Sequence, residues 1–255
     1  MGALVLGLSA CSDNAGLKFD EAEDPSLTED SWVPARYSAE QIHSPITPYV
    51  AESLWNISWE GTWQDDVFMK VGASSTVSTS TLYCFAGSDV DLADYDDLSA
   101  TWTYFLNGDA AGDTPYDRDT LAAVSGMTAG WAITGDPSPM EEEMAAIDPR
   151  LALIHYGTND MGMGTTYASA LPGFYEDMME LMERNVEAGV VPMLTGISHR
   201  GDSASADLWV PSYNATIRGM AQAWQVPFID LFEATEALDG YGLAGDGLHL
   251  NGYSE

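Results

Sequence analysis

The sequence predicts an α/β fold in which helices cover both faces of a parallel β-sheet. Short apolar runs of strand length alternate along the chain with amphipathic stretches of helix length, which is the order expected of parallel strands joined by helical crossovers. Hydrophobic residues make up 45% of the 255 residues, enough to build a sizeable core. A chain of this length accommodates one large α/β domain.

Four apolar runs are the predicted strands. They cover residues 67–71, 151–156, 190–195 and 226–231. The first run stops at Gly72 and the second at Gly157. Because ligands bind at the carboxyl ends of the strands in open parallel sheets, the residues after each run are the ones to inspect for chemistry.

Helices are predicted between and before these runs. They cover residues 48–57, 94–106, 138–147, 167–187 and 213–224. The helix at 138–147 opens with Ser138, Pro139 and three glutamates, a combination typical of a helix N-terminus. The helix at 167–187 is long and amphipathic and ends before Gly189.

We expect residues 1–30 to be a lipoprotein-like signal segment followed by an acidic tether, and residues 31–255 to be one domain with an aromatic lead-in at 31–65. The end of the first apolar run, Leu8-Ser9-Ala10-Cys11, resembles a bacterial lipobox, in which the cysteine is lipidated. This resemblance implies export to the bacterial cell envelope, with the membrane reached only through Cys11. No basic residue precedes the run, so the alternative is a plain disordered N-terminus.

The charge balance excludes several classes of partner. The chain has 40 acidic and 8 basic side chains and a formal net charge of −32. Nucleic-acid binding depends on Lys and Arg contacts to phosphate, and basic patches attract anionic membranes, so we expect neither. The acidity favours solubility in salty surroundings.

The cysteines and the acidic loops carry no expected metal site. Two cysteines, Cys11 and Cys84, cannot build a disulfide framework or a zinc site. Cys84 lies in the apolar run 82–85 and is expected to be buried. The acidic stretch 89–97 lacks the ligand spacing of an EF-hand, which indicates a solvated helix start.

Four short blocks combine residues that catalysis uses. They are 72–76 (Gly-Ala-Ser-Ser-Thr), 125–128 (Ser-Gly-Met-Thr), 157–160 (Gly-Thr-Asn-Asp) and 246–249 (Asp-Gly-Leu-His). A serine on a tight strand-to-helix turn presents its hydroxyl beside backbone N–H groups that favour an oxyanion. A neutral imidazole can accept the serine proton, and a carboxylate can fix the tautomer of that imidazole.

In this order the blocks resemble the SGNH (GDSL-type) family of esterases and acylhydrolases. That family has a GDS turn after its first strand, a glycine block, a GxND block and a DxxH block near the C-terminus. The resemblance covers residues 66–252, and the blocks at 157–160 and 246–249 match outright. Ser125-Gly126 is a looser match, and Ala73 stands where the family has aspartate.

The resemblance implies a role for each matched residue. Ser74 would be the nucleophile, His249 the general base and Asp246 the residue that orients His249. The oxyanion hole would be formed by the backbone N–H groups of Ser74 and Gly126 and by the side chain of Asn159. The implied fold is a three-layer α/β/α sandwich with a flavodoxin-like parallel sheet, with no metal or organic cofactor.

Each of these residues also has a structural interpretation. Ser74 can be a helix N-cap, His249 a loop histidine bonded to backbone, and Asn159 a turn residue. His155 lies inside an apolar run and is expected to be a satisfied core histidine.

A second group of polar residues follows the third run. His199, with Arg200 and Asp202, is a candidate substrate contact. Gly201-Asp202-Ser203 spells the GDS motif, but it does not follow the first strand, so Ser203 is not expected to be the nucleophile.

The function predicted from these features is a serine ester hydrolase on an exported, monomeric lipoprotein. It would form an acyl-enzyme and act on a carboxylic ester of a carbohydrate or lipid. Candidate rim residues that would select the substrate are Trp131, Met161, Met163, Trp209 and Tyr241. The alternative function is a non-catalytic surface binding module on the same fold, which the loss of aspartate at position 73 keeps open.

Overall fold

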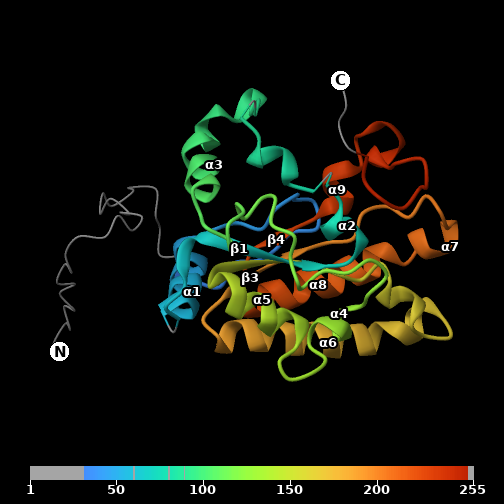
Figure 1. Cartoon of the computed structure of the whole chain (residues 1–255). Coiled ribbons are helices and arrows are strands. Elements are labelled where there is room, and N and C mark those ends of the chain that lie inside the picture. The colour runs from blue at the N-terminus through green and yellow to red at the C-terminus, as the bar shows by residue number, and fades with distance from the viewer. Residues whose placement is uncertain (1–31, 60, 80, 89, 252–255) are drawn as a thin grey trace, which may run out of the picture.

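A parallel β-sheet of four strands forms the centre of the molecule in this computed structural model (Figure 1). The structure describes residues 32–59, 61–79, 81–88 and 90–251. The strands are adjacent in chain order: β1 (Gln64–Gly72), β2 (Pro149–His155), β3 (Val191–Thr195) and β4 (Phe228–Ile229). The predicted α/β fold with a parallel sheet is therefore confirmed.

A short extended segment adds to the sheet beside β1. Ala123 forms a parallel bridge with Gly72, because the Gly72 N–H donates to Ala122 O at 3.1 Å and the Val124 N–H donates to Gly72 O at 3.3 Å. The segment of Ala123 lies between β1 and β2 in the chain, so when it is counted as a strand it is the second of five. The strands then lie across the sheet in the order 2-1-3-4-5. That is the order of a flavodoxin-like, doubly wound sheet.

Helices form the two outer layers (Figure 1). The layer drawn below the sheet contains α4 (Ala129–Ala132), α5 (Pro139–Ile147), α6 (Tyr167–Glu187) and α8 (Val210–Trp224). The upper side carries α2 (Ser74–Val77), α3 (Ser99–Leu106) and α9 (Leu231–Thr235). Among the described residues there are also α1 (Pro48–Trp59), which packs on α6 and β3, and α7 (Ala204–Asp207).

Alternation along β1 explains why both faces need cover. Val67, Met69 and Val71 are buried in the main hydrophobic core. Phe68 lies on the other face, where its ring makes edge contacts with Phe105 of α3 and with Tyr116 at 5.4 Å between centroids. Because successive strand side chains point to opposite faces, a strand that is apolar on both requires a layer on each side.

Capping residues set the helix boundaries that the sequence predicts best. Ser138 forms a capping box with Glu141 at the start of α5, and Thr166 forms one with Ser169 at the start of α6. β1 and α8 each begin three residues before the predicted start, and two further elements differ in kind or length. The predicted helix at 94–106 is a 3₁₀ segment, η3 (Ala93–Leu98), followed by α3, and the strand at 226–231 is reduced to Phe228–Ile229 because Asp230 already caps α9.

The aromatic lead-in closes the outer edge of the sheet. His43 forms an antiparallel bridge with Ile229, and the Ser44 N–H donates to Phe228 O at 2.9 Å. The Tyr37 hydroxyl donates to Val226 O at 2.9 Å. The lead-in therefore packs against the β4 side of the domain, and β1 begins at Gln64, within the range assigned to the lead-in.

The prediction that Cys84 is buried is wrong. Cys84 is a free, exposed cysteine in the 3₁₀ segment η2 (Tyr83–Ala86). The apolar run 82–85 is divided by this tight turn, so its side chains do not share one buried face. Cys11 and the tether at 1–30 lie outside the described residues, and none of the helices within the described ranges has the length and apolarity to cross a bilayer.

Candidate active site

The predicted nucleophile lies on a tight turn at the carboxyl end of β1. The strand ends at Gly72, and α2 begins at Ser74 after a single intervening residue, Ala73. The backbone N–H groups of Thr76 and Val77 donate to Ala73 O at 3.0 and 3.1 Å, which closes the first turn of the helix. Ala73 is only 7% exposed, so this position holds a small apolar side chain inside the core.

The structure brings the three predicted catalytic residues together. Ser74 Oγ lies 2.7 Å from His249 Nε2, and His249 Nδ1 lies 2.6 Å from Asp246 Oδ2. The other carboxylate oxygen, Oδ1, accepts hydrogen bonds from the backbone N–H groups of Leu248 at 2.9 Å and His249 at 3.1 Å. Ser74 and His249 thus meet although 175 residues separate them in the chain.

These contacts determine which nitrogen of His249 carries the proton. The hydrogen bond from His249 and the two backbone N–H bonds hold the pKa of Asp246 well below its usual range, so the carboxylate is ionised and can only accept. In neutral His249 the proton is therefore on Nδ1, where it is donated to Asp246. Nε2 is then free to accept the proton of the Ser74 hydroxyl.

A small closed loop holds Asp246 and His249. Leu243 and Leu250 form an antiparallel bridge at its base, and the Ala244 N–H donates to His249 O at 2.7 Å. The Asn251 N–H donates to Gly242 O at 2.7 Å. The two side chains are partly exposed, 52% for Asp246 and 31% for His249, so backbone hydrogen bonds rather than burial define their geometry.

Gly126 follows the extra sheet segment and reaches the same edge as Ser74. The Met127 N–H donates to Val124 O at 3.2 Å, which makes 124–127 a tight turn with Gly126 at its third position. Gly126 has a φ of +83°, a conformation that favours glycine. The positive φ therefore explains why this position carries glycine, and the sheet topology places it at the edge where an oxyanion would form.

Asn159 and Asp160 connect the end of β2 to the Gly126 turn. The side-chain amide of Asn159 donates to Met127 O at 2.9 Å, which leaves one amide hydrogen for another acceptor. Asp160 Oδ1 accepts from the Ala129 N–H at 2.8 Å, and its Oδ2 accepts from the Gly157 N–H at 2.9 Å. Burial raises the pKa of Asp160 despite these bonds.

Gly157 allows the loop after β2 to pack closely. Its φ is +121°, and a Cβ there would lie 2.6 Å from Ile197 Cδ1. Beside this loop is a small pocket lined by 73–75 and 155–160. The space in this pocket that the centre of a water-sized group can occupy is about 10 Å³. A single water molecule requires roughly 10–15 Å³ on this measure, so the pocket holds about one such group. A wider, shallow hollow along α6 is lined mainly by glutamates and does not include Ser74.

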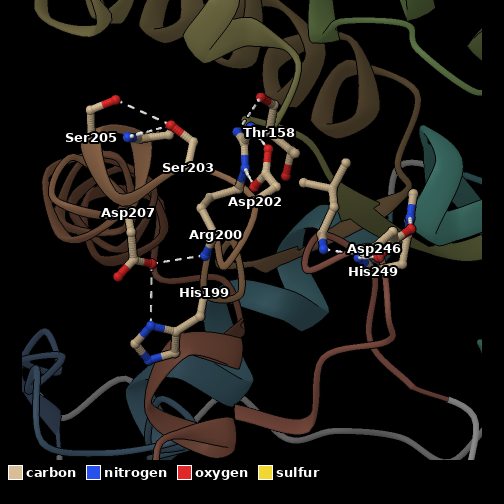
Figure 2. A network of polar contacts seen from close by, with 11 residues as sticks. Thr158, His199, Arg200, Asp202, Ser203, Ser205, Asp207, Asp246 and His249 are labelled. Atoms are coloured by element: carbon tan, nitrogen blue, oxygen red, sulfur yellow. Dashed lines mark hydrogen bonds and ion pairs between the residues drawn. The ribbon is translucent and has the colours of Figure 1, made fainter. Parts of the chain in front are cut away.

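The other predicted histidine positions have structural roles. His155 Nδ1 lies 2.6 Å from Thr195 Oγ1, as expected of a satisfied histidine, and burial lowers the pKa of His155 to about 4. Its side chain is not fully enclosed in the core, because His155 also lines the small pocket that contains Ser74. The expectation that His199 contacts substrate finds no support in its position. Its Nδ1 lies 3.2 Å from Asp207 Oδ1 and its Nε2 2.8 Å from Glu236 Oε2. Figure 2 shows its ring turned toward Asp207 and away from Asp246 and His249.

Ser203 and the candidate rim residues are also placed by the structure. Ser203 caps α7, where its hydroxyl accepts from the Ala206 N–H, as expected of a residue that is not the nucleophile. The prediction that Met161 lies at the rim is wrong, because Met161 is 1% exposed in the core. Trp131 and Trp209 are partly buried against the core, whereas Met163 is 73% exposed.

Sequence reasoning missed two residues of the site. The role of Asp160 as the acceptor that joins two loops was not predicted, although its place after Asn159 marks a turn in which a carboxylate often accepts backbone N–H groups. Arg200 was grouped with His199 as a substrate contact, but its guanidinium binds Asp202 and Thr158 O. No local sequence signal indicates the contacts to Ala129 and Thr158, which are 31 residues from Asp160 and 42 residues from Arg200.

A Ser–His–Asp arrangement at the carboxyl edge of a doubly wound sheet is that of a hydrolytic α/β enzyme. Within the described part of the chain, no group of three or more His, Cys, Asp or Glu side chains is placed to hold a metal ion. Residues 84–253 match the model of the GDSL-like Lipase/Acylhydrolase family. The matched region begins after Ser74 and includes the other three blocks. The chain belongs to this family, and it is a carboxylic ester hydrolase.

The solved structures that resemble this chain have low sequence identity to it. An acetyl esterase, solved as its S10A mutant with acetate ion, is 18% identical with a TM-score of 0.50, and the match covers 72% of this chain and 87% of that one. A GDSL-like lipase from Bacteroides thetaiotaomicron is 16% identical with a TM-score of 0.49, covering 80% and 91%. A carbohydrate esterase family 3 protein from Talaromyces cellulolyticus is 19% identical with a TM-score of 0.48, covering 72% and 87%. No curated protein matches the sequence.

Proposed function

We propose that this chain hydrolyses carboxylic esters through an acyl-enzyme on Ser74. The observation that carries the proposal is the pair of short contacts from Ser74 Oγ to His249 Nε2 and from His249 Nδ1 to Asp246. His249 accepts the serine proton as Oγ attacks the ester carbonyl, and it then donates that proton to the departing alcohol. A water molecule, deprotonated by His249, attacks the acyl-enzyme and releases the acid and Ser74.

The oxyanion of each tetrahedral intermediate would be stabilised by three donors. We assign these to the backbone N–H groups of Ser74 and Gly126 and to the amide hydrogen of Asn159 that does not bind Met127. The N–H of Ser74, at the first position of α2, has no carbonyl one turn earlier within the helix to bind.

We further propose that the acyl group is short, of acetyl size. The pocket beside Ser74 has room for about one water-sized group, which fits a methyl group and not an extended chain. The alcohol half of the ester lies outside this pocket, toward exposed residues, and we propose a carbohydrate or lipid alcohol there. The formal charge of −32 disfavours an anionic alcohol, because like charges repel.

Two variants of the full chain test the mechanism. Ser74→Ala should abolish turnover of a chromogenic acetyl ester and covalent labelling by a fluorophosphonate, with an unchanged melting temperature. Ser203→Ala is the matched control and should retain both activities, because Ser203 caps α7. Activity that persists in Ser74→Ala would exclude the mechanism, and absence of turnover in the unaltered protein would favour the alternative of a non-catalytic binding module.

A series of esters tests the acyl length. With one alcohol and acyl chains of two to eight carbons, kcat/KM should be highest for acetate and fall steeply as the chain lengthens. Equal values for acetate and octanoate would contradict the proposed pocket.

We also propose that the protein is exported and anchored through a lipid on Cys11. The support is the lipobox-like sequence at 8–11, followed by an acidic segment of tether length. Expression of the full gene in a bacterium should yield a membrane-bound form that Cys11→Ser converts to a water-soluble one. Recovery of the unaltered protein from the cytoplasm with Met1 retained would contradict this proposal.

A further inference from the structure

We propose that Arg200, paired with Asp202, is a positioning residue that sets the separation between the loop of Asn159 and the loop of Asp246 and His249. The proposal rests on the function proposed above, because it concerns the alignment of the same site. Both loops lie at the carboxyl edge of the sheet, and a hydrolase needs their donor and base at a fixed distance from one carbonyl carbon.

Arg200 contacts the loop of Asn159 directly. Its Nη1 donates to Thr158 O at 3.2 Å, and this carbonyl belongs to the peptide bond that leads into Asn159 (Figure 2). The Asn159 side chain is bound on its other side to Met127 O. Arg200 therefore supplies one of the contacts that hold the position of the proposed oxyanion donor.

Asp202 connects Arg200 to the loop of the general base. Arg200 Nε and Nη2 donate to the two carboxylate oxygens of Asp202 at 2.8 and 2.9 Å. The backbone N–H of Asp202 donates to Gly247 O at 2.9 Å, and Gly247 lies between Asp246 and His249. The chain of contacts from Thr158 through Arg200 and Asp202 to Gly247 thus joins the two loops.

The Arg200–Asp202 pair is shielded enough to be stiff. The side chains are 13% and 30% exposed. The hydrogen bond between them raises the pKa of Arg200 and lowers the pKa of Asp202, so both stay charged across the working range of an esterase. Bidentate Arg–carboxylate pairs fix orientation as well as distance.

The backbone of Arg200 is itself fixed. Its N–H donates to Asp207 Oδ1 at 2.8 Å, the carboxylate that also binds His199. His199 is stacked between the rings of Phe232 and Tyr241, with centroid separations of 3.7 Å on both sides. His199, which is 4% exposed, and the groups that hold it therefore provide the rigid base from which Arg200 extends.

Lysine would not serve at this position. The three contacts of Arg200 use separate N–H groups of a planar fork, whereas an ammonium is a point charge without that geometry. A misplacement of about 1 Å costs on the order of 100-fold in rate, so loss of the fork should act on kcat more than on stability.

The experiment compares Arg200→Met, Arg200→Lys and Asp202→Asn in the full chain. Arg184→Met is the matched control, because Arg184 also binds two carboxylates, Glu180 and Glu141, but on the surface of α6. Turnover of an acetyl ester is divided by the number of sites that a fluorophosphonate labels at completion, so that unfolded molecules do not count. Ser74→Ala is included to show that turnover comes from the proposed nucleophile.

We expect Arg200→Met to lower kcat per labelled site about 10- to 100-fold with KM within about twofold, and Arg200→Lys to recover only part of the loss. Arg184→Met should leave kcat unchanged. If the pair acts as one unit, adding Asp202→Asn to Arg200→Met should lower kcat no further than Arg200→Met alone.

Three results would overturn the inference. They are a wild-type kcat per labelled site in Arg200→Met, full recovery by lysine, and effects of Arg200 and Asp202 that multiply independently. If Ser74→Ala keeps wild-type turnover, the proposed function fails first and the inference with it. A loss in Arg200→Met with an inactive Ser74→Ala supports both.

Discussion

Replacing Asp160 tests whether the loops of Gly126 and Asn159 must be held together. Asp160 is 3% exposed and accepts from the backbone N–H groups of Ala129 and Gly157. A buried donor without an acceptor costs about 1–3 kcal/mol. Asp160→Ala leaves two backbone N–H donors without an acceptor, so it should lower the free energy of unfolding by about 2–6 kcal/mol. Asp160→Asn keeps one acceptor oxygen and should lose about half as much.

The pH dependence of this effect has a defined sign. Burial raises the pKa of Asp160 in the folded chain above its ordinary value of 3.8, so the folded state binds this proton more tightly than the unfolded state. The stability that the protonated carboxyl contributes is complete at low pH and is lost as pH rises through the folded pKa. The difference in unfolding free energy between the unaltered protein and Asp160→Asn should therefore decrease as pH rises above 3.8.

Urea denaturation and acetyl ester turnover measure the two consequences separately. Asp230→Asn is the matched control, because Asp230 is 4% exposed and also accepts from two backbone N–H groups, those of Phe232 and Glu233. Both substitutions should lower stability, but only the Asp160 variants should lower kcat per folded molecule, by about 10- to 100-fold. An Asp160→Ala protein that folds with wild-type kcat would refute the reasoning.

Three further outcomes are expected. Gly126→Ala should reduce turnover, because its positive φ imposes a backbone strain of about 1–2 kcal/mol on alanine, whereas an added Cβ would meet no atom within 4 Å. Ser125→Ala in the same turn should leave turnover unchanged, and equal effects of the two substitutions would contradict this explanation. Burial lowers the pKa of Lys70 to about 8, so between about pH 8 and 10.5 only the unfolded chain keeps the proton on Lys70. The unfolding free energy of the unaltered protein, measured relative to Lys70→Met, should therefore rise across this pH range, and a constant difference would oppose the interpretation. With a net charge of −32, the melting temperature should rise from 0.01 M to 1 M NaCl as the Debye length falls from about 30 to 3 Å, and a flat or falling value would leave the acidity to solubility alone.

Local signals account for the parts of the fold that the sequence predicted accurately. The helix at 167–187 was predicted with the bounds of α6, because its apolar periodicity is long and Gly189 follows it. The helix at 138–147 was placed by the residues that form its capping box. Cys84 and Met161 were misplaced because burial depends on which layer a short turn faces, and that is decided by distant segments.

The candidate site divides in the same way. Ser74, Asn159 and His249 could be identified because each lies in a short block that resembles a block of the family, and the blocks of Ser74 and Asn159 also follow predicted strands. The distant partners of Arg200 and His199 could not, because Thr158 is 42 residues from Arg200 and Glu236 is 37 residues from His199. No periodicity or spacing encodes such contacts, which depend on how the loops pack after the sheet has formed.

The distance in sequence between Ser74 and His249 has a consequence for folding. The nucleophile lies at the end of the first strand of the sheet, and the base lies 175 residues later in a loop that follows the last strand. Contacts of such high sequence separation form late, because the entropy of closing the intervening chain must be offset by packing that is already in place. The strands can therefore pair before the site exists, so recovery of ester turnover during refolding should trail recovery of the sheet. Enzyme activity then measures completion of the whole domain, and a partly folded chain cannot consume substrate.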